Sequence, residues 1–145
     1  APHLLDDSFR LRDCPMPLYF AGQVAGTEGY CEAIMAGLYV SLRVFAKLSG
    51  VSMSPMPCTT SFGSLVAYAT NPSTADYQPM HVNFGVFPPL EQPIRNKGAR
   101  YAAFLERQRT DLASYCEELS QNGLLLDGAE NLVERWFAAV QEAGL

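Results

Sequence analysis

The chain has 145 residues, a formal net charge of −5 and a hydrophobic content of 48%. This length and balance are typical of one globular domain and exclude a disordered protein, and the negative charge argues against a generic nucleic-acid-binding protein. The longest nearly uncharged run, residues 33–42, is about half of the roughly 20 residues that a membrane-spanning helix needs, so we expect no membrane contact.

The cysteines and the first residues indicate a reducing compartment. Four cysteines lie far apart in the sequence and only two histidines accompany them, so the metal-ligand spacing of a zinc site is missing and we expect no metal. Unpaired thiols of this kind are typical of the cytosol. The chain also opens without the basic and apolar regions of a secretory signal peptide, so we expect a cytoplasmic protein.

The first third of the chain predicts an extended segment, a short strand and a long helix. Residues 1–17 are polar and contain prolines, which is typical of an extended segment. Residues 18–21 form an apolar run that ends at a glycine, as an inner parallel strand does. A helix is expected over about residues 28–48. Its main apolar face contains Ile34, Leu38, Leu42 and Phe45.

The remainder of the chain predicts a short helix, a loop and a helical hairpin. The short helix covers about residues 60–70, with Leu65 and either Tyr68 or Ala69 pointing inward. Residues 71–89 carry several large apolar side chains, which indicates an ordered loop rather than a linker. One hairpin helix begins near Pro93, and its apolar stripe contains Tyr101, Leu105, Leu112, Cys116 and Leu119. The other helix begins after Asp127, with Glu130 completing a capping-box pattern.

Three glycines, Gly22, Gly26 and Gly29, separate the predicted strand from the predicted helix. In α/β folds such a junction directs backbone N–H groups and the positive end of the helix dipole toward an anion, and Thr27 is placed to cap the helix. A phosphate or the electron-rich edge of a reduced flavin would suit this position. However, the spacing GxxxGxxG is not the dinucleotide fingerprint GxGxxG, and tight packing of strand on helix explains the same glycines without a ligand.

The stretch LYFAGQVAGTEGYCEAIMAGL resembles the flavin-contacting segment of the GidA-like flavoproteins. A second stretch, DYQPMHVNFGVFPPLEQPIRNKGARYAAFLERQRTDL, is similar to the C-terminal pattern of one branch of that superfamily, the TrmFO-type folate- and FAD-dependent uracil-5 methyltransferases. The stretches PHLLDDSFRLRD and TTSFGSLVAYAT also match in order. The resemblance therefore covers about residues 1–115.

The resemblance implies an α/β fold that is mainly helical within this chain, namely the C-terminal part of a Rossmann-like FAD-binding domain followed by the helical hairpin. Residues 1–52 would be the flavin-facing segment, residues 53–90 the short helix and the loop near the active-site mouth, and residues 91–145 the helical region. The ADP-binding motif and the nucleophilic cysteine of the family would lie in an N-terminal part of the enzyme that this chain lacks. We therefore expect no catalytic residue in this chain, and neither tight FAD binding nor turnover by the chain alone.

The resemblance also implies a set of cofactor-binding residues. Gly22 and Gln23 would lie beside the ribityl chain and the phosphates of FAD. The residues expected at the isoalloxazine are Gly26, Thr27, Glu28, Gly29 and Tyr30.

In the loop, Asn83 would contact folate or flavin with Phe84 packed beneath it, or both would only fasten the loop to the core. His81 stands where the family pattern has asparagine. It could still form a hydrogen bond there, but the favoured explanation is a tolerated polar residue of the loop.

A basic stretch provides a candidate RNA surface. Residues 95–109 contain five basic side chains and one acidic side chain. Lys97, Arg100 and Arg107 fall on one face of the expected helix, which would suit contacts to phosphates, and a solvated helix face is the alternative.

The function that the resemblance implies is methyl transfer to C5 of a uridine in the T loop of tRNA. Methylenetetrahydrofolate would donate the one-carbon unit, FADH2 would be the reductant, and NAD(P)H would regenerate it. The partners would be tRNA and the N-terminal part of the same enzyme. Alternatives are a GidA-like enzyme that methylates rRNA or modifies the tRNA wobble uridine, and a non-enzymatic helical binding module.

Overall fold

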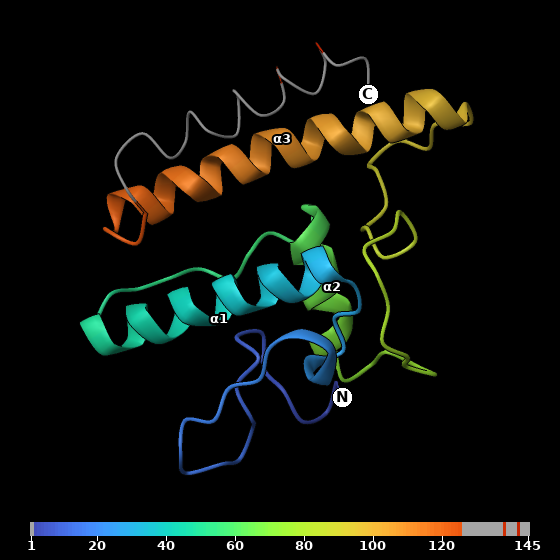
Figure 1. The fold of residues 1–145 in the computed structure, drawn as a ribbon. Helices are drawn as coiled ribbons and strands as arrows, with labels where there is room; N and C mark the ends of the chain where they lie inside the picture. Colours follow the sequence, from blue (N-terminus) through green and yellow to red (C-terminus); the bar gives the residue numbers. More distant parts are fainter. Residues whose placement is uncertain (1, 126–137, 139–141, 143–145) are drawn as a thin grey trace. The chain divides into compact units, whose positions relative to one another are not determined.

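The structure is a computed structural model that describes residues 2–125, 138 and 142, and these residues are mainly helical (Figure 1). Their helices are the short 3-10 helix η1 (Gly22–Ala25) and the α-helices α1 (Tyr30–Ser49), α2 (Ser61–Thr70) and α3 (Lys97–Gln121). The chain divides into two compact units, residues 1–87 with η1, α1 and α2, and residues 88–145 with α3. Among the described residues, no helix is both long enough and apolar enough to cross a membrane.

The strand expected over residues 18–21 does not form. Residues 18–20 instead pair antiparallel with residues 9–11, through the amide of Leu11 to the carbonyl of Leu18 at 2.8 Å and the amide of Phe20 to the carbonyl of Phe9 at 2.9 Å. Within the described residues β-pairing is confined to isolated bridges. An inner parallel strand needs a parallel partner on each side, and the described residues do not supply one.

The first residues are folded back rather than extended. The side chain of Asp6 accepts the backbone N–H groups of Ser8 at 2.9 Å and Arg10 at 3.0 Å, which closes a tight turn. Phe9 occupies the tip of this turn with φ +56° and is fully buried. The turn therefore places an aromatic ring in the core of the first unit.

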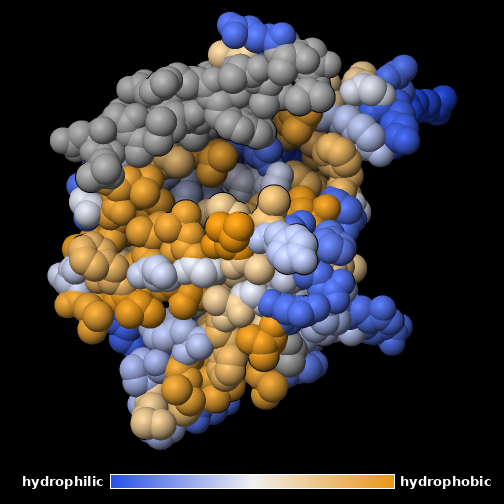
Figure 2. All heavy atoms as spheres, in the orientation of Figure 1, coloured by the Kyte–Doolittle hydropathy of each residue, from blue (hydrophilic) through white to orange (hydrophobic). Residues whose placement is uncertain are grey.

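Helix α1 lies between two glycines and buries a face that the sequence did not predict. Gly29 precedes it with φ +100°, and Gly50 ends it with φ +69° while donating to the carbonyls of Ala46 and Lys47. Its buried residues are Ala36, Tyr39 and Ala46. The expected face is wrong as a buried surface, because Ile34, Leu38 and Phe45 are 71%, 51% and 54% exposed. Figure 2 shows apolar side chains gathered over α1.

Helix α2 and the turn residue Phe9 complete the core of the first unit. Thr60 caps α2 by accepting the N–H of Gly63 at 3.2 Å. Leu65 and Ala69 are fully buried, which confirms the inward face of this helix. The rings of Phe9, Tyr39 and Phe62 pack edge to face with centroids 6.0–6.5 Å apart, a geometry that aromatic pairs prefer.

Helix α3 begins later than expected and buries a different stripe. Asn96 caps it by accepting the N–H of Ala99 at 2.9 Å, so Pro93 lies before the helix. Its buried residues are Phe104, Gln108, Tyr115 and Leu119. Of the predicted stripe only Leu119 is buried, and Leu105 is 46% exposed. The expected second hairpin helix, with Asp127 and Glu130, lies outside the described residues.

Candidate functional site

The glycine junction between residues 22 and 29 adopts a backbone that glycine alone adopts readily. The φ angles of Gly22, Gly26 and Gly29 are +71°, +88° and +100°. A side chain would strain each position, and at Gly26 a Cβ atom would also collide with the hydroxyl of Tyr77. At Gly29 it would collide with the carboxylate of Glu32. The glycines therefore serve both a left-handed backbone and the close approach of neighbouring groups.

The loop of residues 71–89 lies directly on this junction. Met80 donates its N–H to the carbonyl of Gly26 at 3.3 Å and accepts the N–H of Glu28 at 3.2 Å, which forms a parallel bridge between Thr27 and Met80. The N–H of Val82 donates to the carboxylate of Glu32 at 3.1 Å. The structure thus brings the ordered loop predicted from the sequence to the predicted cofactor segment.

The charges at the start of α1 are mostly negative. Glu28 and Glu32 lie there, and the imidazole of His81 is 3.9 Å from the first carboxylate and 4.0 Å from the second. Carboxylates near a helix N-terminus stabilise the helix, but they also repel another anion and so oppose its binding. This position therefore suits the neutral ring and hydroxyl groups of a flavin better than it suits a phosphate.

Two buried hydroxyls at the junction lack partners. Thr27 is fully buried and Tyr77 places its hydroxyl against Gly26, and neither hydroxyl has a hydrogen-bond partner among the described residues. The predicted helix cap by Thr27 is wrong, because no side chain caps α1. Burial raises the pKa of Tyr77, and the neighbouring Tyr68 adds to the shift, so the phenol stays protonated and can donate. Unpaired buried hydroxyls are costly, so each is a candidate to bind a water molecule, an ion or a ligand.

Two side chains of the junction are exposed and have groups that a flavin could contact. Gln23 is exposed and carries an amide that can both donate and accept, and the ring of Tyr30 is 93% exposed at the start of α1. Together with the left-handed glycines and the unpaired hydroxyls, these groups fit the ribityl and ring portions of FAD. The described residues contain no group of three or more His, Cys, Asp or Glu side chains that could hold a metal ion.

Asn83 and Phe84 are used within their own loop. The amide of Asn83 donates to the carbonyl of His81 at 2.9 Å and accepts the N–H of Gly85 at 2.8 Å. The rings of Phe84 and Phe87 lie with centroids 5.6 Å apart. These contacts agree with a clip that fixes the loop, and the contact to folate or flavin stays a prediction.

The three basic residues of the candidate RNA surface differ in their surroundings. Lys97 and Arg100 both lie over the ring of Tyr101, at 5.5 and 5.8 Å from its centroid. Arg107 donates to the carbonyls of Pro88 at 2.7 Å and Pro89 at 2.9 Å, and lies over Phe104. The structure brings the first two together, whereas the third already fixes the segment that precedes α3.

Tyr77 is the site residue that sequence reasoning missed. The sequence indicates a large apolar side chain in an ordered loop but does not pair it with Gly26. Tyr77 reaches Gly26 because its loop pairs with the junction through the bridge between Thr27 and Met80. These two residues are 53 positions apart in the sequence. No local pattern carries that information.

Known proteins match this chain along most of its length. Residues 1–52 match the family described as Glucose inhibited division protein A. The methylenetetrahydrofolate–tRNA-(uracil-5-)-methyltransferase TrmFO of Thermosynechococcus vestitus is 39% identical over 132 residues, which are 90% of this chain and 29% of the relative.

Two further relatives with the same name agree. The protein of Novosphingobium aromaticivorans is 39% identical over 83% of this chain and 26% of its own length. That of Streptococcus gordonii is 40% identical over 81% of this chain and 27% of its own length. The chain is therefore a TrmFO-type sequence of the GidA family, and it spans a little over a quarter of the length of these relatives.

Proposed function

We propose that this chain is part of an enzyme that forms 5-methyluridine in the T loop of tRNA, with methylenetetrahydrofolate as one-carbon donor. The observation that carries the proposal is the 39% identity to a TrmFO over 90% of the chain. At the site, the left-handed glycines and unpaired hydroxyls of the junction support it. The junction is the one described feature that fits a flavin.

The cofactor of this proposal is FAD, which in its reduced form supplies the reducing equivalents that turn the one-carbon unit into a methyl group. NAD(P)H would regenerate the reduced form. The amide of Gln23 would bind the ribityl hydroxyls, and the ring of Tyr30 would offer a stacking surface. Thr27 and Tyr77 would donate hydrogen bonds from inside the junction, where no acceptor among the described residues competes for them.

The finer features of the fold belong to the same proposal. Residues 18–21 would join the parallel sheet of a Rossmann-like domain in the whole enzyme, next to strands that this chain does not contain. Residues 1–52, which match the GidA family, would then be its flavin-facing segment. The cytoplasm, where tRNA is modified and thiols such as these stay reduced, would be its location.

RNA contacts are proposed at the start of α3. Lys97 is exposed and Arg100 is half-buried, and the positive groups of both lie over the ring of Tyr101. Phosphate contacts of this kind position an RNA without reading its sequence. Arg107 would contribute less, because its guanidinium already serves two carbonyls.

The test is nucleoside mass spectrometry on a strain that lacks the gene for this protein. We expect 5-methyluridine to disappear from tRNA and to stay unchanged in rRNA, and the wild-type gene to restore it. Loss from rRNA alone would support rRNA methylation instead, and loss of wobble-uridine modification would support a GidA-like enzyme. If the modified nucleosides stay unchanged in both RNAs, the non-enzymatic binding module would be the remaining explanation.

A further inference from the structure

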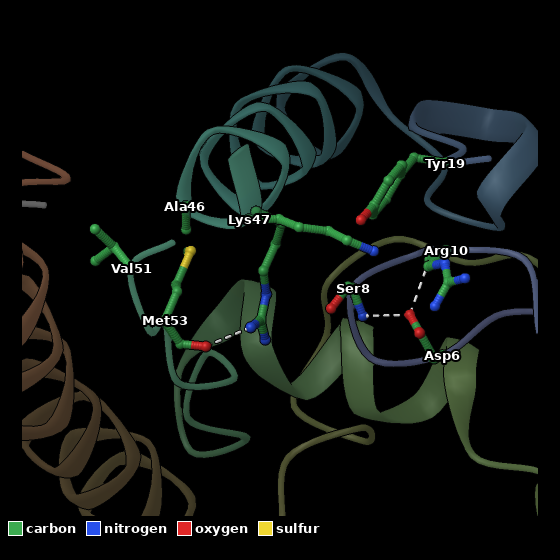
Figure 3. A pocket seen from close by; sticks show the side chains of 9 residues that line it. Asp6, Ser8, Arg10, Tyr19, Ala46, Lys47, Val51 and Met53 are labelled. Carbon is green, nitrogen blue, oxygen red and sulfur yellow. Dashed lines mark hydrogen bonds between the residues drawn. The ribbon is translucent and has the colours of Figure 1, made fainter. Parts of the chain in front are cut away.

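A cationic pocket lies in the first unit at the C-terminal half of α1, about 280 Å³ in volume (Figure 3). Its walls come from the turn of residues 6–10, from Tyr19, from α1 and from the segment that follows α1. Lys47 is 17 residues after Tyr30, which corresponds to roughly 25 Å along the helix. The α1 wall of the pocket therefore lies far from the start of α1, and the lining residues include none of residues 22–30.

The charge of the pocket is opposite to that of the chain. Arg10, Arg43 and Lys47 line it together with a single carboxylate, Asp6, so its formal charge is +2 in a chain of −5. One carboxylate oxygen of Asp6 already accepts two backbone N–H groups. None of the three cations forms an ion pair with any residue that the structure describes. Within the part of the chain that the structure describes, the positive charge of the pocket thus exceeds the charge of its one carboxylate.

Arg43 differs from the other two cations because its guanidinium is part of the fold. It donates to the hydroxyl of Tyr39 from two nitrogens, at 2.7 and 3.1 Å, and to the carbonyl of Met53. These bonds hold a fixed positive charge at the base of the pocket. Lys47 and Arg10 therefore remain as the cations that can move toward a ligand.

Several donors around the pocket have no acceptor. The ammonium group of Lys47 and the hydroxyl of Tyr19 make no hydrogen bond to the described residues. The guanidinium of Arg10 donates only to the carbonyl of Cys14 among them, at 3.3 Å, and its Nε is buried and unpaired. Figure 3 shows the side chains of Lys47, Arg10 and Tyr19 around the same space. An isolated surface lysine needs no ligand, but here a second cation and a hydroxyl line the same pocket as the lysine. Donors of this kind match a ligand that carries several acceptor oxygens.

We propose that this pocket binds a phosphate group, with Lys47 and Arg10 as its charged partners and Tyr19 as a hydrogen-bond donor. Arginine and lysine are the side chains that most often hold phosphate, and Tyr19 would add a bond without charge. The phosphate of an RNA backbone and that of a nucleotide share this chemistry. The pocket would thus give the chain an anion site in addition to the phosphate contacts proposed at the start of α3, and one that the glycine junction does not provide.

The proposal is tested on the 145-residue chain with inorganic phosphate as the probe. We expect titration to shift the amide NMR signals of residues 8, 10, 19 and 47 and to saturate. Lys47→Gln and Arg10→Gln should each weaken the affinity at least tenfold. The matched control, Arg95→Gln, removes an exposed cation outside the pocket and should change nothing.

Folding is followed by circular dichroism, and Tyr19→Phe, which keeps the ring, should weaken binding about threefold even if an arginine variant unfolds. Shifts spread over all surface amides, or equal affinities for Lys47→Gln and Arg95→Gln, would overturn the proposal.

Two further titrations identify the source of the phosphate. Tighter binding of an RNA hairpin than of inorganic phosphate, lost in Lys47→Gln, assigns the pocket to RNA. Tighter binding of NADPH, lost in the same variant, assigns it to a nucleotide. If neither the RNA hairpin nor NADPH binds more tightly than inorganic phosphate, the pocket has no functional role as a phosphate site, and the proposal is overturned. Because the readout is binding to this chain, failure here leaves the methyl-transfer proposal intact.

Discussion

Individual glycines of this chain have opposite roles, and the structure separates them. Gly26 has φ +88° and lies against the hydroxyl of Tyr77, whereas Gly37 sits inside α1 with open space where a side chain would point. We predict that Gly26→Ala lowers the free energy of unfolding by about 1–3 kcal/mol, through backbone strain and the collision with Tyr77.

The matched control is Gly37→Ala, which should raise the free energy of unfolding by about 0.5–1 kcal/mol because alanine favours a helix interior. Urea denaturation of both variants measures the difference. Equal effects of the two substitutions would show that Gly26 does not need its left-handed conformation.

Tyr39 links the core to the N-terminal turn through its hydroxyl. It donates to the carbonyl of Asp7 at 2.9 Å and accepts from Arg43. Burial raises its pKa, although Arg43 acts in the opposite direction. Tyr39→Phe should therefore lower the free energy of unfolding at pH 7 by about 1–2 kcal/mol, since it removes these bonds from the core.

The pH dependence of this effect follows from the sign of the shift. An unfolded tyrosine ionises near pH 10, and the folded protein resists ionisation of Tyr39, so the stability from this residue is complete below about pH 10 and is lost as the pH rises further. The gap between wild type and Tyr39→Phe should narrow above pH 10 in urea denaturation. A gap that stays constant to pH 11 would contradict the assigned burial.

At the scale of elements, α1 exposes the apolar face that the sequence predicted to be buried. Leu65→Ala in α2 should cost about 2–5 kcal/mol because the side chain is fully buried. Leu38→Ala in α1 should change the free energy of unfolding by no more than about 0.5 kcal/mol, because that side chain is half exposed. Thermal or urea denaturation of the two leucine variants makes the comparison. A large loss at Leu38 would mean that the face is covered in solution.

The bounds of α1 and α2, unlike the start of α3, could be predicted from the sequence because they depend on local signals. Gly29, Gly50 and Thr60 mark the ends of α1 and α2 within two residues of the expected positions. The buried face of α1 could not be predicted, since this helix is apolar on most sides and its partners decide which side is covered. Phe9 and Phe62 are those partners, and Phe9 reaches the core only through an unpredicted turn.

Helix α3 carries the prediction for RNA. Charge reversal of Lys97 and Arg100 to glutamate should weaken tRNA binding by the native protein and reduce the slope of affinity against salt, because phosphate contacts release counterions. Arg109→Glu is the matched control, since Arg109 already pairs with Glu106 at 3.2 Å. Filter binding at several salt concentrations measures both. Equal slopes in all variants would leave the solvated helix face as the explanation.

For the whole molecule, we predict that the 145-residue chain alone does not bind FAD with sub-micromolar affinity. The described residues offer one glycine junction that suits the neutral part of a flavin, and carboxylates beside it oppose phosphate. The sequence also contains no GxGxxG motif for the diphosphate. Fluorescence titration of FAD with the chain tests this. A dissociation constant below a micromolar value would show that the junction holds the cofactor unaided.

The candidate site could be predicted only in part. The glycines are visible in the sequence because their spacing at the predicted strand-to-helix boundary is unusual, and the resemblance points to a flavin. The contact of Tyr77 with Gly26 and the approach of His81 to Glu32 depend on a loop that returns about 50 residues later. Long-range pairings of this kind leave no local pattern, so the electrostatics of the site required the structure.

The central claim is that this chain belongs to a folate-dependent enzyme that methylates tRNA. Its most direct test is a methylation assay of the native protein, as its gene encodes it, with FAD, NADPH, methylenetetrahydrofolate and an unmodified tRNA transcript. We predict 5-methyluridine at the T-loop uridine, detected by mass spectrometry, and none when methylenetetrahydrofolate is omitted. No 5-methyluridine with the complete set of reagents, or the same amount without the folate, would contradict the claim.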